Sequence, residues 1–182
     1  TATTALKLSG LAGITMYEPE EMVFTARAGT TLAEVEAALA KHNQHLAFEP
    51  SGDNATIGGI IAAGTAGPRR FAAGAARDHL LGFTAVNGKG ERFKAGGRVV
   101  KNVTGYDLPK LAAGSFGTLF AMTEVTLRAL PKGTSTVLAV EGWTASQALL
   151  LLRAIAGSPL DPTGLAYVAD ASLALIRLEG QD

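Results

Sequence analysis

The sequence contains no cysteine among its 182 residues. Without a thiol, this chain cannot form a disulfide, a thiolate zinc site or an iron–sulfur centre, so any such chemistry must belong to a partner. An excess of either charge is also lacking, because 16 Lys and Arg side chains balance 16 Asp and Glu side chains. Nucleic-acid binding needs clustered basic residues, and the densest cluster is the pair Arg69 and Arg70. We therefore expect no nucleic acid as a partner.

Long apolar runs are absent as well. The most membrane-like stretch, Asn54–Pro68, is shorter than the ~20 apolar residues of a spanning helix, and four glycines interrupt it. Residues Thr1–Gly10 lack the basic start and apolar stretch of a signal peptide and do not begin with Met, so we expect an N-terminal truncation. With neither signal nor span, we expect a cytoplasmic protein, with any membrane association made through partners.

Hydrophobic residues make up 47% of the chain and charged residues 18%, which is enough apolar surface for a sizeable core. The run Met22–Ala26 predicts a short strand. Thr31 and Glu34 then form a capping box, and apolar residues at helical spacing predict a helix from Thr31 to about Lys41. The chain therefore begins with a strand, a tight turn and a helix.

Two further strands are predicted around a hairpin. Leu80–Val86 and Glu91–Lys94 flank Asn87-Gly88, a strong short-range hairpin signal. Leu119–Leu130 reads as another apolar strand, which Pro131 ends.

The composition changes after Pro131. Thr136–Val140 predicts a strand, Ser146–Ile155 a Leu-rich helix and Leu165–Val168 another strand. This β-α-β piece is too short to close its own core. We therefore expect a domain over residues 1–131 and the beginning of a second domain over residues 132–182.

Conventional nucleotide-binding motifs are absent. The segment from Gly82 to Lys89 has one residue too many for a P-loop, and no G-x-G-x-x-G sequence follows a strand and opens a helix. The remaining glycine concentration is Gly58, Gly59, Gly64 and Gly67. Such a segment is either a tightly packed turn or a loop whose backbone amides approach a pyrophosphate, and composition does not separate the two.

Several side chains could carry chemistry, but each has a structural explanation. His42 and His45 lack an obvious third metal ligand, so a solvated helix end is favoured and no metal is expected. Arg77-Asp78 before His79 is favoured as an Arg–carboxylate pair that anchors a loop, rather than as an acid–base group.

The remaining candidates are no stronger. Lys101 and Tyr106-Asp107 could transfer protons, but we expect them to fix a loop. Ser115 lacks the G-x-S-x-G spacing of a nucleophile elbow, so a serine hydrolase is not supported.

Taken together, many short segments stand in the order and spacing of one known family. They are Pro50, Thr56–Gly59, Gly67, Arg77-Asp78, Val103–Leu108, Gly114–Thr118, Thr123-Glu124 and Leu130-Pro131. Between Leu8 and Pro131 the chain resembles the FAD-linked oxidase family of the vanillyl-alcohol-oxidase (PCMH) type. It is most similar to the FAD-binding E subunits of bacterial glycolate oxidases, which share segments like those at Arg27–Thr30, Gly67–Arg70 and Lys101–Leu108.

The resemblance implies an α+β PCMH-type FAD-binding fold, represented by its second FAD-binding subdomain and followed by the start of a ferredoxin-like cap domain. The family's first phosphate loop would lie upstream of Leu8. FAD is the implied cofactor, and Arg77-Asp78 would help to hold the flavin end of the site. The positions implied to contact FAD are Pro50, Thr56, Ile57, Gly58, Gly59, Gly64, Thr65, Asp78 and Met122.

The implied reaction is oxidation of glycolate, a 2-hydroxy acid, to glyoxylate. The implied partners are a catalytic flavoprotein subunit and an iron–sulfur subunit of the same complex. This chain departs from the family at Gly64-Thr65, where many relatives have Asn-Ala, and at Phe116, where catalytic relatives have Glu. The catalytic residues therefore remain unassigned. An assembly subunit without functional flavin and a self-sufficient flavin dehydrogenase are the alternatives.

Overall fold

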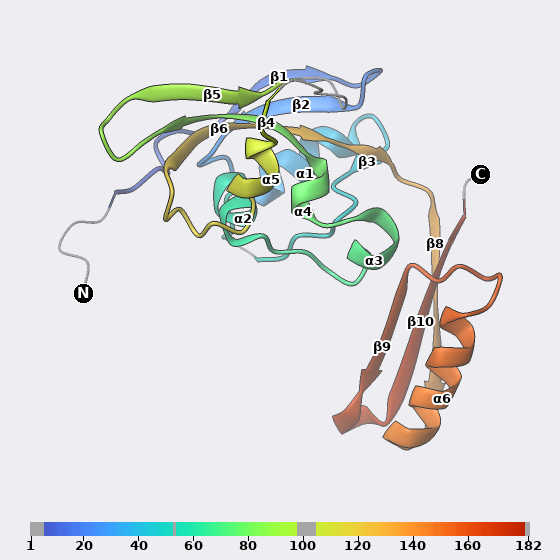
Figure 1. Ribbon diagram of the computed structural model, residues 1–182. Helices are drawn as coiled ribbons and strands as arrows, with labels where there is room; N and C mark the ends of the chain where they lie inside the picture. Colours follow the sequence, from blue (N-terminus) through green and yellow to red (C-terminus); the bar gives the residue numbers. More distant parts are fainter. Residues whose placement is uncertain (1–5, 53, 98–104, 181–182) are drawn as a thin grey trace.

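The computed structural model describes residues 6–52, 54–97 and 105–180, and its fold is α+β, as the sequence analysis expected (Figure 1). A five-stranded sheet with helices on one face forms the larger unit, and a three-stranded sheet with one helix forms the smaller unit. Within the described residues, no helix combines the length and the apolar character that a membrane span requires.

The five-stranded sheet has the order β1-β2-β6-β4-β5, and every neighbouring pair is antiparallel. The strands are β1 (Ile14–Glu18), β2 (Val23–Arg27), β6 (Ala121–Arg128), β4 (Leu80–Val86) and β5 (Arg92–Gly96). The central strand, β6, comes from much later in the chain than its neighbours. Its residues Val125 and Leu127 are fully buried, because helices cover that face.

Five helices lie along the covered face of the sheet (Figure 1). They are α1 (Leu32–Ala40), α2 (Ile57–Ala63), α3 (Arg70–Ala73), α4 (Ala76–His79) and α5 (Leu108–Ala112). Ile57 and Ile61 of α2 and Phe24 of β2 belong to the same fully buried core. Two short strands, β3 (Gln44–His45) and β7 (Leu130–Pro131), pair beside the main sheet.

The predicted strand at the start and the helix after it are confirmed as β2 and α1. The Thr31 hydroxyl accepts a hydrogen bond from the Glu34 amide at 3.2 Å, and the Glu34 carboxylate accepts one from the Thr31 amide at 2.9 Å. The capping box therefore begins the helix where the sequence placed it.

The predicted hairpin is confirmed as β4 and β5, but its turn is longer than Asn87-Gly88. The Asn87 side-chain oxygen accepts from the amides of Lys89, at 2.9 Å, and Glu91, at 3.0 Å. The left-handed residue is Gly90, with φ of 80°, rather than Gly88. An asparagine that bonds to the backbone two and four residues ahead stabilises this wider loop.

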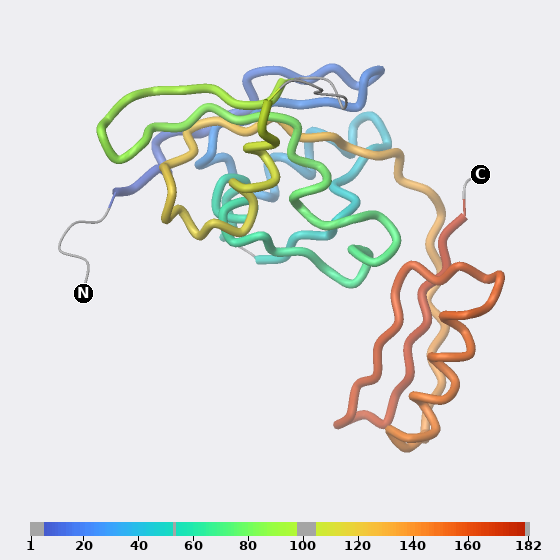
Figure 2. Tube along the Cα trace, viewed as in Figure 1, coloured from blue at the N-terminus to red at the C-terminus, as the bar shows by residue number. Residues whose placement is uncertain are grey.

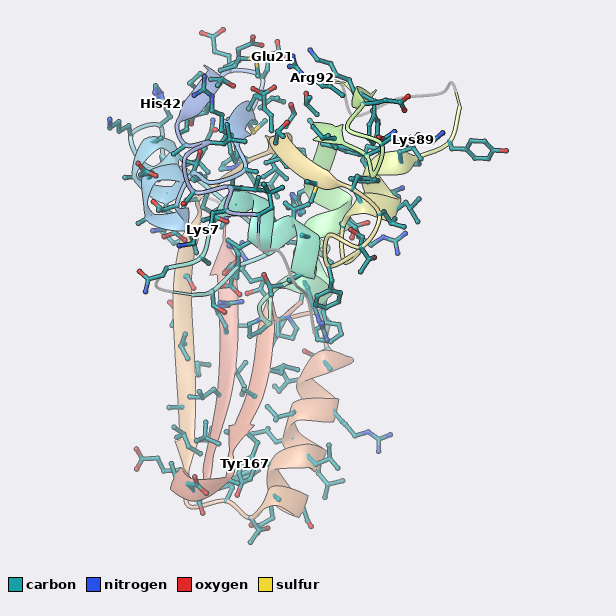
Figure 3. All side chains as sticks on the ribbon, turned by 90° about the vertical axis from the view of Figure 1, so that its left-hand side faces the viewer. Lys7, Glu21, His42, Lys89, Arg92 and Tyr167 are labelled. Carbon is teal, nitrogen blue, oxygen red and sulfur yellow. The ribbon has the colours of Figure 1, made fainter. Side chains whose placement is uncertain are left out.

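The smaller unit contains β8 (Thr134–Glu141), α6 (Ala145–Ala156), β9 (Gly164–Val168), the 3-10 helix η1 (Ala169–Ala171) and β10 (Leu173–Gly180). Its strands pair antiparallel in the order β8-β10-β9, and we call it the βαββ unit. Ala148 of α6 is buried with Ala174 and Ile176 of β10. The sequence predicted every element except β10 and η1. Tyr167 lies at the end farthest from the large sheet (Figure 3), where its hydroxyl donates to the Trp143 carbonyl at 2.8 Å.

The chain passes from the larger unit to the βαββ unit through residues 131–133, at the end of β7 (Figure 2). Gly133 is held against β10, since a Cβ there would come within 2.3 Å of the Gly180 carbonyl oxygen. The division into a first domain at residues 1–131 and a second from residue 132 stays a prediction.

Candidate functional site

A cavity of about 420 Å³ opens beside the N-terminal half of α2. We call it the α2 cavity. Its walls come from the start of the described chain, from the end of β2, from α2 and from the beginning of β6. The lining residues are Leu6, Leu8, Ala28, Thr56, Gly58, Gly59, Ala62, Gly117, Phe120, Ala121 and Met122.

The start of α2 forms one side of this cavity. Thr56 is the N-cap residue, and its hydroxyl accepts from the Gly59 amide at 3.3 Å. The Ile57 amide donates to the Thr30 carbonyl at 2.8 Å, and the Gly58 amide donates to the Ala28 carbonyl at 2.9 Å. These amides are therefore bonded within the protein. Of the three, only the Gly59 amide can be released by rotation of a side chain.

The two adjacent positions, 58 and 59, favour glycine for different physical reasons. A Cβ at Gly58 would lie 2.5 Å from the Ala28 Cβ and 2.8 Å from the Ala28 carbonyl oxygen. Gly58 is thus required by the packing of α2 against the end of β2. A Cβ at Gly59 would meet only the Thr56 hydroxyl, at 3.2 Å. A side chain at Gly59 would instead occupy the cavity that this residue lines.

The opposite wall of the α2 cavity is apolar and firmly packed. Met122 is buried on β6, next to Ala121 and Phe120. The Phe120 ring stacks on Phe83 with 5.0 Å between centroids and meets the edge of Phe93 at 5.3 Å. Such offset-stacked and edge-to-face contacts fix the orientation of the rings. The wall therefore offers a preformed apolar surface to a ligand.

The loop before β6 closes the far end of α2. The Gly114 amide donates to the Ile61 carbonyl at 3.0 Å, and the Phe116 amide donates to the Ala62 carbonyl at 2.7 Å. Phe116 has φ of 53°, a left-handed conformation that is unfavourable for a side chain of this size. The Ser115 hydroxyl is buried and has no hydrogen-bond partner in the part of the chain that is described. Ser115 itself does not line the α2 cavity, but the glycine-lined floor and the apolar wall of the cavity fit part of a large cofactor such as FAD.

Four of the nine residues that the sequence analysis assigned to FAD come together on the α2 cavity. They are Thr56, Gly58, Gly59 and Met122. Ile57 is fully buried in the core beneath α2, and Gly64 ends α2 with φ of 67°. Pro50 is buried in the segment before α2, and Thr65 is exposed after it.

Asp78, the ninth residue, stands at α4. Its carboxylate accepts from the Ala75 amide at 2.9 Å, and in the described structure this backbone group replaces the expected partner Arg77. His79 is fully buried, and its Nε2 donates to the Ala73 carbonyl at 2.8 Å. Burial lowers the pKa of His79, which keeps the ring neutral. These side chains hold the α3–α4 segment in place.

The two histidines near the end of α1 have separate partners. His42 stands at the outer end of the helix (Figure 3) and meets the Tyr17 ring edge-on at 5.3 Å. The Arg69 guanidinium donates to the His45 ring at 3.0 Å. Burial, followed by the charge of Arg69, lowers the pKa of His45 to about 4. They therefore do not converge on one metal ion.

The remaining candidates fix loops or lie outside the described residues. The Asp107 carboxylate accepts from the Lys110 amide at 3.3 Å and caps α5. Tyr106 is 93% exposed. Lys101, with the first part of the Val103–Leu108 motif, lies outside the described residues.

The cavity also includes residues that were not predicted to contact FAD, from four distant parts of the chain. They are Leu6, Leu8, Ala28, Ala62, Gly117, Phe120 and Ala121. Ala28 and Gly117 lie in segments that carry the family resemblance, and Ala62 follows Gly58 and Gly59 by one helical turn and so shares their face.

Comparisons with known proteins identify the family of this chain. The sequence profile of the FAD binding domain matches residues 1–96. Glycolate oxidase subunit GlcE of Escherichia coli K12 is 41% identical over 170 residues, which are 92% of this chain and 48% of that protein. A D-lactate dehydrogenase of Archaeoglobus fulgidus is 34% identical over 115 residues, covering 63% of this chain and 26% of that protein. The chain thus spans about half the length of the first relative and a smaller share of the length of the second.

A solved structure supports the fold. That of an alkyldihydroxyacetonephosphate synthase superposes with a TM-score of 0.78 and 19% identity, covering 94% of this chain and 37% of that one. The resemblance expected from the sequence is thereby confirmed: the chain belongs to the FAD-linked oxidase family of the vanillyl-alcohol-oxidase type.

Proposed function

We propose that this chain is the FAD-binding part of a multi-subunit oxidoreductase that oxidises a 2-hydroxy acid, with glycolate converted to glyoxylate. The observation that carries the proposal is its 41% identity over 170 residues with a glycolate oxidase subunit. Other relatives are named as D-lactate dehydrogenases, which also act on a 2-hydroxy acid. We prefer glycolate to lactate as the substrate because this chain is 41% identical to the glycolate oxidase subunit and 34% identical to the D-lactate dehydrogenase.

Four residues of the α2 cavity would hold the cofactor. Gly59 lets the cofactor approach the backbone closely, because no side chain stands between them. The Thr56 hydroxyl can turn from the Gly59 amide toward a phosphate oxygen and release that amide as a second donor. Met122 supplies an apolar, polarisable surface opposite. Bound FAD would supply the redox chemistry by accepting a hydride equivalent.

The other five assigned residues would act around these four. Ile57 and Gly64 fix the position and the length of α2, and Pro50 and Thr65 lie in the segments on either side of it. Asp78 caps α4. We propose that these five shape the segment that carries the cofactor.

We propose that the catalytic base comes from outside the α2 cavity. Among the described residues that line the α2 cavity, no side chain titrates near neutral pH, so none of these can accept the hydroxyl proton of a 2-hydroxy acid. We propose that a catalytic flavoprotein subunit supplies this base. An iron–sulfur subunit would take the electrons onward, since these 182 residues have no cysteine to hold a cluster.

We also propose that residues 1–131 form the FAD-binding domain and that residues 132–182 begin a ferredoxin-like cap over the substrate. The βαββ order of the second part supports this division. A cytoplasmic location, with membrane association through partner subunits, completes the proposal.

A specific observation favours the alternative of an assembly subunit with little or no flavin. The amides of Ile57 and Gly58, which a pyrophosphate could have used, are bonded to carbonyl groups of the protein. A non-catalytic chain could keep the fold with these bonds in place.

The visible absorbance spectrum of the purified full chain tests both readings. Flavin bands, and free FAD released on heating, are expected for the FAD-binding subunit. The 2-hydroxy-acid assay with partner subunits would follow. A folded, colourless protein that takes up no added FAD would contradict the proposal and favour the assembly role.

A further inference from the structure

Four charged side chains meet where the βαββ unit touches the larger unit. Glu49 and Arg69 come from the segments after β3 and before α3, whereas Arg177 and Glu179 come from β10. We call these four residues the charge cluster. Their side chains are only 14–29% exposed, so solvent screens them weakly.

Glu49 is the anchor of the cluster on the larger unit. Its carboxylate binds the Arg177 guanidinium through two bonds, one of them 2.9 Å long from Nη2 to Oε2. The same carboxylate accepts from the Arg69 amide at 3.1 Å. Burial opposes the charge, but the Arg177 hydrogen bonds and the neighbouring positive charges hold the pKa of Glu49 below its usual range. Glu49 is therefore ionised and links both units at neutral pH.

A second ion pair joins the two units, and here the larger unit supplies the arginine and the βαββ unit supplies the carboxylate. The Arg69 guanidinium contacts the Glu179 carboxylate at 2.5 Å, and Arg177 Nε lies 3.4 Å from the same carboxylate. Arg69 also donates to the neutral ring of His45 at 3.0 Å. Each unit thus contributes one acid and one base, and the four charges balance.

The cluster lies beside a cleft between the units and is bonded to one of its walls. This cleft has a volume of about 440 Å³ and is lined by Phe71 of α3 on one side and by residues 161–165 on the other. Arg177 donates to the Thr163 hydroxyl and carbonyl, both at 3.2 Å. Phe71 follows Arg69 by two residues and is 86% exposed. The width of the cleft therefore depends on the same side chains that join the units.

We propose that Glu49, Arg69, Arg177 and Glu179 are positioning residues that set the orientation of the βαββ unit and so the width of the cleft beside Phe71. The backbone crosses between the units at residues 131–133, where the Lys132 amide donates to the Asn43 carbonyl at 2.8 Å, and the charge cluster adds side-chain contacts that fix the angle between the units. Partly buried ion pairs contribute little net stability compared with apolar contacts, but removing one partner leaves an uncompensated charge. Such pairs penalise wrong orientations more than they stabilise the right one.

The test is a distance measurement on the full chain. Spin labels on Lys41→Cys and Ala154→Cys, two exposed positions on different units, are clean probes because these 182 residues contain no native cysteine. The unaltered charge cluster is expected to give one narrow distance distribution. Glu49→Gln is expected to raise the fraction of other orientations by about tenfold to a hundredfold, as follows from losing a charge-assisted hydrogen bond.

The control is Lys110→Gln, which breaks an exposed ion pair with Asp107 inside the larger unit. It should leave the distribution unchanged. Glu179→Gln, which removes the partner of Arg69, provides a second disruption should Glu49→Gln fail to fold. A folded Glu49→Gln or Glu179→Gln chain that matches the control would overturn the proposal.

A kinetic measurement separates positioning from simple stability. In the flavin-loaded complex, Glu49→Gln should raise the KM for the 2-hydroxy acid or lower kcat several-fold, with the flavin bound per chain unchanged. The distance measurement needs no flavin. A chain that binds no FAD would therefore contradict the proposed function and still allow the charge cluster to be judged.

Discussion

Alanine should have opposite effects at the two adjacent glycines of α2. At Gly58 the new Cβ would meet Ala28 at 2.5 Å, a distance that requires the backbone to move. Overpacking of this kind costs about 1–3 kcal/mol, against a gain of about 1 kcal/mol from replacing a helical glycine. At Gly59 the only neighbour is the Thr56 hydroxyl at 3.2 Å, so most of the gain should remain.

The measurement is thermal unfolding of both variants without cofactor. Gly58→Ala should melt below Gly59→Ala by about 4–8 °C, which corresponds to about 2 kcal/mol in a domain of this size. Gly88→Ala is the matched control, because a Cβ at this exposed position meets nothing within 4 Å. Equal melting temperatures for the two α2 variants would refute the packing argument.

Cofactor retention then separates the two roles. Gly59→Val should fold normally, because its side chain enters the cavity rather than the core. It should weaken FAD binding roughly five- to 150-fold, the equivalent of about 1–3 kcal/mol of overpacking in a filled site. Undiminished FAD binding by a folded Gly59→Val chain would remove the α2 cavity from the cofactor site.

Three further predictions concern stability. The pKa of His45 is about 4 in the folded chain and about 6.5 when unfolded, so the unfolded state takes up the proton first and stability falls as pH drops from about 6.5 toward 4. The expected loss in the free energy of unfolding is about 1–2 kcal/mol after allowance for solvent screening. In thermal melts between pH 6.5 and 4, a His45→Gln chain should lose less stability than the unaltered chain. Thr31→Ala should lower the free energy of unfolding by about 1 kcal/mol in urea, because it removes the cap of α1, whereas an unchanged midpoint would contradict the capping role. Phe83→Ala should cost about 3–5 kcal/mol and Phe83→Leu less, since Phe83 is 4% exposed and stacks on Phe120; equal losses in denaturant would argue against the ring contacts.

Sequence alone was sufficient where the signal is local. The capping box of Thr31 and Glu34 and the strands of the β4–β5 hairpin depend on residues close together in the chain. The prediction that Pro131 ends the strand Leu119–Leu130 was wrong, because β6 ends at Arg128 and Pro131 belongs to β7, which pairs with the distant strand β3. The helix α2 was not predicted, because Gly58 and Gly59 lower helix propensity, and the burial of Ile57 and Ile61 in the core compensates for this only once the chain is folded.

The site was predictable only in part, for a similar reason. Small residues at Gly58 and Gly59 indicated a close approach, but the walls provided by Leu8 and Phe120 come from segments far apart in sequence. The bond between Glu49 and Arg177 spans 128 positions, and neither residue carries a local pattern that points to the other. Contacts between residues so far apart in sequence can be identified only when the arrangement of the strands is known.

The central position of β6 has a consequence for biosynthesis. This strand pairs with β2 on one side and β4 on the other, yet it begins at residue 121, beyond the segment 1–96 that the FAD-binding profile matches. A nascent chain that has emerged only to residue 96 therefore presents two unpaired strand edges, which are sites for mispairing with other chains. The sheet can form only after β6 has been synthesised, because β6 pairs with both β2 and β4. Until then, the exposed edges of β2 and β4 must be protected from other chains.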